Sequence, residues 1–268
     1  MWDPALYQRY GDERTRPFTD LLGRVRSDDP QLVVDLGCGP GDQTATLLRR
    51  WPAARVVGVD SSPEMIDAAQ AHAVPGRLAF VHADARDWQP DDPVDVLVSN
   101  ATLQWVPDHL DLLPELARLL APDGWLAFQV PGNFEAPSHT ELTALRESPR
   151  WRDQLSSGAA RAAAAHEPAA YLDALVRLGL TPDVWETTYL HLLRGEDAVL
   201  EWTRGTALRP VFAVLDGAAR EEFVADYAAR LRAAYPRHEF GTLLPFRRIF
   251  AVAHRDSGRN PAGTARVP

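Results

Sequence analysis

The sequence predicts an α/β protein with a doubly wound, mostly parallel seven-stranded sheet covered by helices on both faces. One observation is that short apolar runs alternate with helical patterns through the first half of the chain, as is typical of parallel sheets. Another is that a glycine-rich turn joins the first apolar run to a helix, as in nucleotide-binding folds of this type. In such folds the ligand lies at the carboxyl ends of the strands.

The first half of the chain supplies five strands with helices between them. The apolar runs predict strands near 32–36, 55–60, 77–82, 94–99 and 124–130. The intervening patterns predict helices near 42–51, 62–72 and 108–121. This alternation of strands and helices predicts a parallel sheet with helices on both faces.

The pattern changes after Pro131. Residues 135–165 are alanine-rich helical material, and 168–178 reads as a helix ended by Gly179. Alternation of apolar and polar residues predicts a strand over 184–191, and an apolar run predicts a last strand over 244–254. A helical insertion of about 195–237 lies between them, and an apolar stripe on its longer helix is expected to be core: Phe223, Tyr227, Leu231 and Tyr235.

These elements are expected to form one domain over 1–255. Within it we expect a cofactor-binding core at about 20–131 and a helical cap built from about 135–180 and 195–240. The tail at 256–268 is rich in glycine, proline and asparagine and is expected to be disordered.

Composition excludes several functions. A net charge of −9 argues against a nucleic-acid partner, because binding a polyanion requires a basic surface. No run of about eighteen apolar residues is present, so no membrane span is expected, and the amino terminus has no targeting pattern. We therefore expect a cytoplasmic protein that is a monomer or weak homodimer. No cluster has metal-ligand spacing, and the single cysteine, Cys38, allows no internal disulfide.

The glycine turn distinguishes between cofactors. Gly37, Gly39 and Gly41 alternate, whereas dinucleotide sites favour Gly-x-Gly-x-x-Gly. Pro40 removes an amide that a pyrophosphate would use, and Asp35 offers a carboxylate for an ammonium group. S-adenosylmethionine has a free amino acid end and no phosphate, so the turn favours it. An NAD(P)-dependent oxidoreductase stays a remote alternative.

Five motifs in order resemble those of the class I S-adenosylmethionine-dependent methyltransferases, which have a Rossmann-like fold. They are VVDLGCGPGDQT at 33–44, GVDSSPEMI at 58–66, HADARDW at 82–88, DVLVSNATLQW at 95–105 and LLAPDGWLAF at 119–128. The resemblance implies that Asp60 binds ribose hydroxyls, that Asp84 and Ala85 contact adenine, and that Asn100 lies at the rim near the reactive methyl group. The implied cofactor-binding set is Asp35, Gly37, Cys38, Gly39, Asp60, Ser61, Met65, Asp84, Ala85 and Asn100.

Segments outside these motifs resemble the trans-aconitate methyltransferase family over nearly the whole chain up to about 255. They include Trp2-Asp3-Pro4, the run at 100–109, the strand at 185–191 and Leu208-Arg209-Pro210. The resemblance implies an O-methyltransferase that forms the monomethyl ester of trans-aconitate or a similar small polycarboxylic acid. It weakens over 135–165, which leaves another small-molecule oxygen or carbon acceptor as the alternative.

A small anionic carboxylic acid needs positioning rather than a strong base, because a carboxylate is already ionised at neutral pH. No certain catalytic residue is therefore assigned. Orientation near the methyl group is assigned to Tyr7, Asn100, Gln104, Trp105 and Tyr189. Binding of the unreactive carboxylates is assigned to Arg14, Arg209, Arg248 and His191, since guanidinium groups pair bidentately with carboxylates. Arg247 and Arg248 are adjacent on a strand, so only one can face the acceptor.

Overall fold

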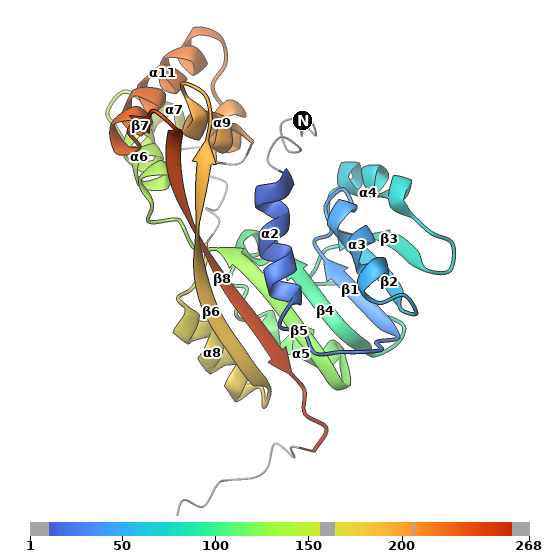
Figure 1. Cartoon of the computed structure of the whole chain (residues 1–268). Helices are drawn as coiled ribbons and strands as arrows, with labels where there is room; N and C mark the ends of the chain where they lie inside the picture. The colour runs from blue at the N-terminus through green and yellow to red at the C-terminus, as the bar shows by residue number, and fades with distance from the viewer. Residues whose placement is uncertain (1–10, 156–163, 206, 259–268) are drawn as a thin grey trace, which may run out of the picture. The chain divides into compact units, whose positions relative to one another are not determined.

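The computed structural model describes residues 11–155, 164–205 and 207–258, with the side chains described from residue 15 onward (Figure 1). These residues divide into two compact units. The sheet unit comprises 15–130, 166–186 and 249–258. The helical unit comprises 131–155, 164–165, 187–205 and 207–248, together with 11–14.

The sheet unit is built on five parallel strands in the order β3-β2-β1-β4-β5. They are β1 (Leu32–Leu36), β2 (Arg55–Asp60), β3 (Leu78–His82), β4 (Val94–Asn100) and β5 (Leu120–Pro131). The order continues with β8 (Gly241–His254) and β6 (Thr181–Leu193), and the two-residue β7 (Arg237–His238) pairs antiparallel with β8. The predicted doubly wound fold is confirmed. Because the winding direction reverses between β1 and β4, the ligand crevice is expected at the carboxyl ends of these two strands.

Helices connect and cover these strands. They are α2 (Gly11–Leu22), α3 (Asp42–Arg50), α4 (Pro63–Ala69) with the short η1 (Gln70–His72), η2 (Leu103–Trp105), α5 (Leu113–Leu119) and α8 (Pro168–Arg177). Figure 1 shows α2 in front of the sheet and α8 behind it. Every residue of β1 is buried, as expected of a central parallel strand that is covered on both faces.

A buried tyrosine fastens α8 to the segment that follows β4. The hydroxyl of Tyr171 lies 2.7 Å from Nε2 of His109 and accepts a hydrogen bond from the backbone N–H of His166 at 3.1 Å. Both Tyr171 and His109 are buried. Burial raises the pKa of Tyr171 to about 12 and lowers that of His109, so both rings stay neutral at pH 7.

The helical unit holds α6 (Pro137–Arg146), α7 (Arg152–Leu155), α9 (Ala198–Arg204), α10 (Arg209–Phe212) and α11 (Gly217–Ala234), with the adjoining parts of β6 and β8. The expected apolar stripe on α11 is buried, so its assignment to the core is confirmed. Its tyrosines also bind α6: the hydroxyl of Tyr227 donates to the carbonyl of Ser138, and the N–H of Ser138 donates to the hydroxyl of Tyr235.

Some element boundaries differ from expectation. The helix expected at 108–121 begins only at Leu113, because 103–112 forms η2 and successive turns in which Asp108 has φ 52°. The strand expected at 184–191 extends over 181–193, and α8 belongs to the sheet unit although it was expected within the cap. In the tail, Ser257 donates to the carboxylate of Asp123, and residues 259–268 lie outside the described part. The expected domain limits stay a prediction.

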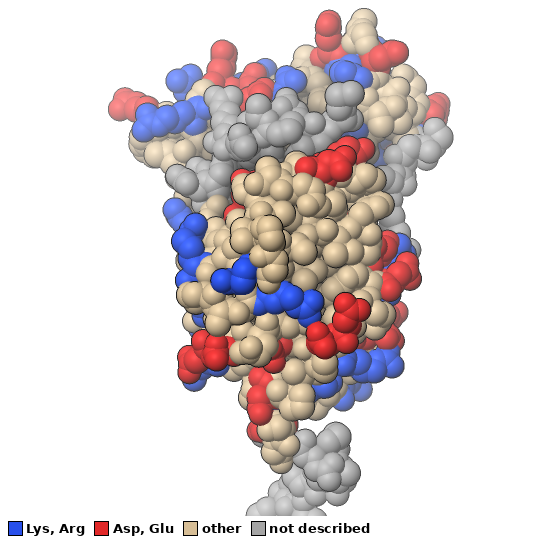
Figure 2. Space-filling view, turned by 90° about the vertical axis from the view of Figure 1, so that its right-hand side faces the viewer, with Lys and Arg blue, Asp and Glu red and all other residues tan. Residues whose placement is uncertain are grey.

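Two features of the described residues concern the expected absence of a nucleic-acid partner and of a membrane span: the charges on the surface and the character of the helices. On the face seen in Figure 2, acidic and basic side chains are interspersed around a broad uncharged area. Within the described residues, no helix combines the length and the apolar character that crossing a membrane requires.

Candidate functional site

The glycine turn after β1 requires glycine for different reasons at different positions. Gly37, Gly39 and Gly41 have φ values of 83°, 55° and 86°, a region that side chains disfavour. A Cβ on Gly37 would lie 2.0 Å from Oγ1 of Thr102, and one on Gly41 would lie 2.8 Å from the ring of Phe80. A Cβ on Gly39 would meet no described atom within 4 Å. The backbone of Gly39 is therefore open to a ligand, whereas Gly37 and Gly41 permit close packing.

Asp60, at the end of β2, joins the glycine turn to α4. Its carboxylate accepts hydrogen bonds from the N–H of Gly39 and from the N–H of Ser62, both at 2.9 Å. The helix cap itself is Ser62, whose hydroxyl accepts from the N–H of Met65 at 3.3 Å. Asp60 is thus not needed as a cap. Each carboxylate oxygen has a further lone pair, which suits hydrogen bonding to ribose hydroxyls.

Asp35 is a buried carboxylate beneath the turn. Its Oδ2 accepts a hydrogen bond from the hydroxyl of Thr44 at 2.6 Å, whereas its Oδ1 has no hydrogen-bond partner among the described residues. Burial raises the pKa of Asp35 to about 7, against the effect of the Thr44 hydrogen bond and with added repulsion from Asp60. A buried, half-satisfied carboxylate of this kind favours a positively charged ligand nearby.

Cys38 is buried in the same turn. Burial and the charges of Asp35 and Asp60 raise the pKa of its thiol well above the usual range. Because the thiolate is the nucleophilic form, Cys38 is suited to packing rather than to covalent chemistry.

Asp84, two residues beyond β3, is paired with Arg86. Nε of Arg86 donates to Oδ1 at 2.8 Å and Nη2 donates to Oδ2 at 2.6 Å. These hydrogen bonds lower the pKa of Asp84 to about 2, so the carboxylate is ionised at every working pH. Arg86 was not among the predicted residues, although it lies within the HADARDW motif. Ala85 between them is half-buried.

The rim after β4 holds a row of side-chain amides. Nδ2 of Asn100 donates to Oε1 of Gln43 at 2.6 Å, and Nε2 of Gln129 donates to Oδ1 of Asn100 at 2.5 Å. Gln104 is buried and its Nε2 donates to the carbonyl of Ala101 at 2.6 Å. Trp105 is 59% exposed. Gln43 and Gln129 were not among the predicted residues, although Gln43 lies inside the first motif.

Three predicted site residues lie in the helical unit: Tyr189, predicted for orientation, and His191 and Arg248, predicted for binding of the acceptor. Tyr189 and His191 are two positions apart on β6, so they share one face of the strand. Both are buried, as is Arg248 on β8. The His191 ring stacks on Trp202 with centroids 4.8 Å apart and lies 5.9 Å from Phe246, over whose ring the Arg248 guanidinium sits at 4.7 Å. The neighbouring Arg247 is half-buried, and the expectation that only one of the two arginines faces the acceptor stays a prediction. Trp202 and Phe246 had no sequence signal beyond being aromatic.

The remaining predicted residues are not brought into this cluster by the described contacts. Arg209 begins α10 and is exposed. Ser61 is exposed and Met65 is half-buried on α4. Arg14 lies in α2 with its side chain outside the described part, and Tyr7 lies outside the described residues altogether. The predicted roles of these residues stay predictions.

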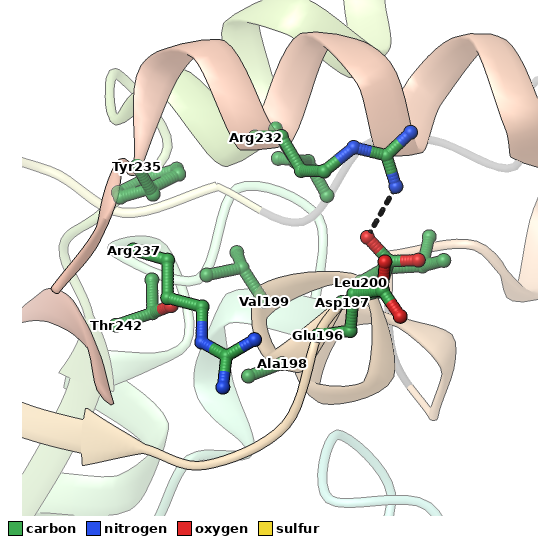
Figure 3. A pocket seen from close by; sticks show the side chains of 10 residues that line it. Glu196, Asp197, Ala198, Val199, Leu200, Arg232, Tyr235, Arg237 and Thr242 are labelled. Carbon is green, nitrogen blue, oxygen red and sulfur yellow. Dashed lines mark hydrogen bonds and ion pairs between the residues drawn. The ribbon is translucent and has the colours of Figure 1, made fainter. Parts of the chain in front are cut away.

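Figure 3 shows a separate pocket of the helical unit. Arg232 points toward Asp197 across it, with their side chains paired at 2.6 Å. Its lining is Glu196, Asp197, Ala198, Val199, Leu200, Leu231, Arg232, Tyr235, Arg237 and Thr242. None of the predicted site residues lines this pocket. Among the described residues, no group of three or more His, Cys, Asp or Glu side chains is arranged to hold a metal ion.

Comparison with known proteins identifies the class. The model of the methyltransferase domain family matches residues 33–124, which hold the glycine turn, Asp60, Asp84 and the rim. The fold is similar to that of the YcgJ protein from Bacillus subtilis, with a TM-score of 0.60, 15% identity and coverage of 90% of this chain and 98% of that one. It is also similar to geranyl diphosphate C-methyltransferase from Streptomyces coelicolor A3(2), with a TM-score of 0.53 and 18% identity over 90% and 76% of the two chains. Fold and site together define an S-adenosylmethionine-dependent methyltransferase.

Curated relatives narrow the class to a family. The chain is 56% identical over 262 residues to trans-aconitate 2-methyltransferase of Streptomyces avermitilis, covering 96% of this chain and 97% of that protein. It is 55% identical to the enzyme of the same name from Streptomyces coelicolor, covering 96% and 88%. The chain belongs to the trans-aconitate 2-methyltransferase family. The oxidoreductase alternative is thereby discarded.

Proposed function

We propose that this protein transfers the methyl group of S-adenosylmethionine to one carboxylate of trans-aconitate, forming a monomethyl ester. The observation that carries the proposal is the identity of 56% and 55% to trans-aconitate 2-methyltransferases over nearly the whole chain. The matches cover 96% of this chain, so they extend beyond the cofactor motifs, although over 135–165 the alanine-rich sequence had left another acceptor open.

The residues of the sheet unit fit S-adenosylmethionine. Asp35 has an unsatisfied buried oxygen for the ammonium group, the backbone of Gly39 is open, and Asp60 retains lone pairs for the ribose. When bound, the cofactor supplies an electrophilic methyl group on a sulfonium. We assign its binding to the predicted set: Asp35, Gly37, Cys38, Gly39, Asp60, Ser61, Met65, Asp84, Ala85 and Asn100.

The chain's contribution to the reaction is positioning and the exclusion of water. The acceptor carboxylate is ionised at neutral pH, so no side chain has to remove a proton. Its oxygen forms the new bond to the methyl carbon as the carbon–sulfur bond breaks, and two opposite charges are neutralised. Holding two reactants in line contributes about 7–11 kcal/mol, and fixed dipoles in place of bulk water contribute the rest. Gln104, Trp105, Tyr7 and Tyr189 are proposed to orient the reacting groups.

The unreactive carboxylates are assigned to cationic side chains. Arg248 is the strongest candidate, because it is buried with its guanidinium 4.7 Å from the ring centroid of Phe246. A guanidinium has the planar fork that pairs with a carboxylate. His191, stacked on Trp202, is assigned beside it. Arg14 and Arg209 complete the proposed set. A clamp on the reacting carboxylate itself would lower its nucleophilicity.

We further propose a single catalytic domain over 1–255 that acts in the cytoplasm as a monomer or weak homodimer, without a nucleic-acid or membrane partner. The net charge of −9 and the interspersed charges of Figure 2 support the absence of a nucleic-acid partner.

The test is transfer of labelled methyl groups. The protein is incubated with methyl-labelled S-adenosylmethionine and a panel of di- and tricarboxylic acids, with a neutral phenol as the matched non-acid acceptor. We expect label in a base-labile ester of trans-aconitate. Transfer to the phenol with none to any acid would overturn the proposal. Transfer to a different acid alone would show that this acid, and not trans-aconitate, is the acceptor.

A further inference from the structure

We propose that Gln129 is a positioning residue for methyl transfer, acting by fixing the orientation of the Asn100 side-chain amide at the rim of the site. The inference rests on the methyl transfer proposed above, and Gln129 itself is assigned to neither ligand. Gln129 lies in β5 and is completely buried.

The supporting observation is a directional row of three amides. Gln129 donates from Nε2 to Oδ1 of Asn100, and Asn100 donates from Nδ2 to Oε1 of Gln43 at 2.6 Å. The three residues come from β5, from the last position of β4 and from the first turn of α3, which follows the glycine turn. The row therefore links the rim to the helix that begins beside the cofactor loop.

The orientation of the middle amide follows from its neighbours. An amide has an acceptor oxygen and a donor NH₂ group on opposite sides, so a donor from Gln129 on one side leaves only NH₂ for the other. Gln43 meets that NH₂ with an oxygen. If the side-chain amide of Asn100 alone turned over, its NH₂ would face the NH₂ of Gln129 and its oxygen would face the oxygen of Gln43. Either mismatch leaves part-buried polar atoms unsatisfied.

The backbone beside Asn100 is held by the same residue. Ala101 has φ 56°, which is strained for a residue with a side chain. Its N–H donates to the carbonyl of Gln129 at 3.0 Å, and its carbonyl accepts from Nε2 of Gln104 at 2.6 Å. Gln129 thus constrains both the side chain of Asn100 and the turn that carries Gln104 and Trp105.

Substitutions at Gln129 separate orientation from packing. In Gln129→Glu the ionised carboxylate cannot donate to Oδ1 of Asn100, so the Asn100 amide is expected to turn its NH₂ toward position 129. When the introduced carboxyl group is protonated at lower pH, its O–H can donate again and the original orientation returns. Because burial raises the pKa of a carboxyl group, this recovery is expected between about pH 5 and 7. Gln129→Met removes the donor at every pH. We expect kcat to fall roughly 10- to 100-fold in both at pH 8, with KM for both substrates within about threefold. Only Gln129→Glu regains activity as the pH falls.

Groups other than residue 129 also change the pH dependence of kcat, and they do so in every variant. Asp35 titrates near pH 7 in the same unit, so each profile is divided by that of the unsubstituted protein. Ser99→Ala is the matched control, because Ser99 is also completely buried and its hydroxyl donates to the carbonyl of Leu36 outside the amide row. We expect it to lower thermal stability but to leave kcat within about twofold.

Gln43 is half-buried and provides a second pair of variants at the other end of the row. Gln43→Glu keeps an acceptor for Nδ2 of Asn100 and is expected to keep kcat within about threefold. Gln43→Met removes the acceptor and is expected to lower kcat about tenfold. This pair decides the question if the Gln129 variants do not fold.

Folded Gln129 variants with unchanged kcat at all pH values would overturn the proposal. An equal, pH-independent loss in Gln129→Glu, Gln129→Met and Ser99→Ala would also overturn it, since packing alone would explain that result. The same holds if Gln43→Glu loses as much activity as Gln43→Met. The proposed substrate is tested separately by the unsubstituted protein, and the variants are then compared on whichever acceptor that protein methylates.

Discussion

Gly37 and Gly39 stand two residues apart in one turn, and alanine at each is expected to fail in a different way. Both have positive φ, so alanine costs about 1–2 kcal/mol at either position. At Gly37 the new Cβ would also lie 2.0 Å from Oγ1 and 2.5 Å from Cβ of Thr102. Because the Cβ of Thr102 is fixed to its backbone, rotating the side chain does not relieve this overlap.

The overlap adds about 1–3 kcal/mol at Gly37. We expect Gly37→Ala to lower the free energy of unfolding by about 2–5 kcal/mol and Gly39→Ala by about 1–2 kcal/mol. At about 2–4 °C per kcal/mol, Tm falls by roughly 4–20 °C for Gly37→Ala and roughly 2–8 °C for Gly39→Ala. Thermal denaturation followed by circular dichroism measures both. In the double variant Gly37→Ala/Thr102→Gly the overlap is removed, and its Tm is compared with that of Thr102→Gly alone.

Gly39→Ala is expected to have the smaller effect on stability but to weaken cofactor binding. No described atom lies within 4 Å of a Cβ built on Gly39, so that methyl group occupies the space through which a ligand reaches the backbone. Gly39→Ala should therefore remain folded yet weaken S-adenosylhomocysteine binding at least tenfold, as measured by titration calorimetry. If the folded Gly39→Ala protein binds S-adenosylhomocysteine as tightly as the unsubstituted protein does, the assignment of this turn to the cofactor is refuted.

Four further substitutions test other residues. Asp35→Asn removes a carboxyl group that burial keeps protonated up to about pH 7 in the folded protein, whereas the unfolded chain releases the proton near 3.8. Asp35 therefore destabilises the fold progressively as pH rises from about 4 to 7, and the Tm of Asp35→Asn relative to the unsubstituted protein should rise over that range. Arg248→Lys keeps the charge but loses the planar fork, so KM for the acid should rise about tenfold with cofactor affinity unchanged; Arg209→Lys should raise the same KM. Tyr171→Phe leaves the His109 ring and the His166 N–H without their common partner, and should cost about 1–3 kcal/mol in a denaturant titration.

Specific results would contradict these expectations. A constant Tm difference between Asp35→Asn and the unsubstituted protein over pH 4–7 would mean that Asp35 is ionised in the fold. An unchanged KM would remove Arg248 or Arg209 from the acceptor site. Unfolding of Tyr171→Phe at the same denaturant concentration as the unsubstituted protein would show that water replaces the lost hydroxyl.

The strand and helix pattern could be predicted because it depends on local periodicity and turn chemistry. The five parallel strands fall within a few residues of expectation, since buried parallel strands are short apolar runs bounded by glycine, proline or aspartate. The start of α5 could not be predicted in this way. The segment 108–112 has helical composition, but Asp108 adopts φ 52° and η2 occupies the preceding residues. Tertiary contacts such as that of His109 with Tyr171 decide this geometry.

The candidate site was predictable where a residue's role depends on its own backbone or on a motif. Gly37 and Gly39 have positive φ, Asp60 accepts a hydrogen bond from the turn and Arg248 is buried. Their roles toward the ligands stay predictions. Partners that are distant in sequence left no such signal. Gln129 and Gln43 are 86 positions apart and both hydrogen-bond to Asn100. His191 on β6 contacts Trp202 of α9 and Phe246 of β8, the strand next to β6 in the sheet.

The carboxylates at three neighbouring strands show why charge cannot be assigned from sequence alone. Asp35 in β1, Asp60 at the end of β2 and Asp84 beyond β3 would each be counted as one negative charge. Arg86 holds the pKa of Asp84 at about 2, whereas burial and the charge of Asp60 raise that of Asp35 to about 7. A cationic ligand beside Asp35 would favour its ionised form and release a proton near neutral pH. The affinity for a cofactor that carries an ammonium group should therefore increase as the pH rises through about 7, and this dependence should disappear in Asp35→Asn.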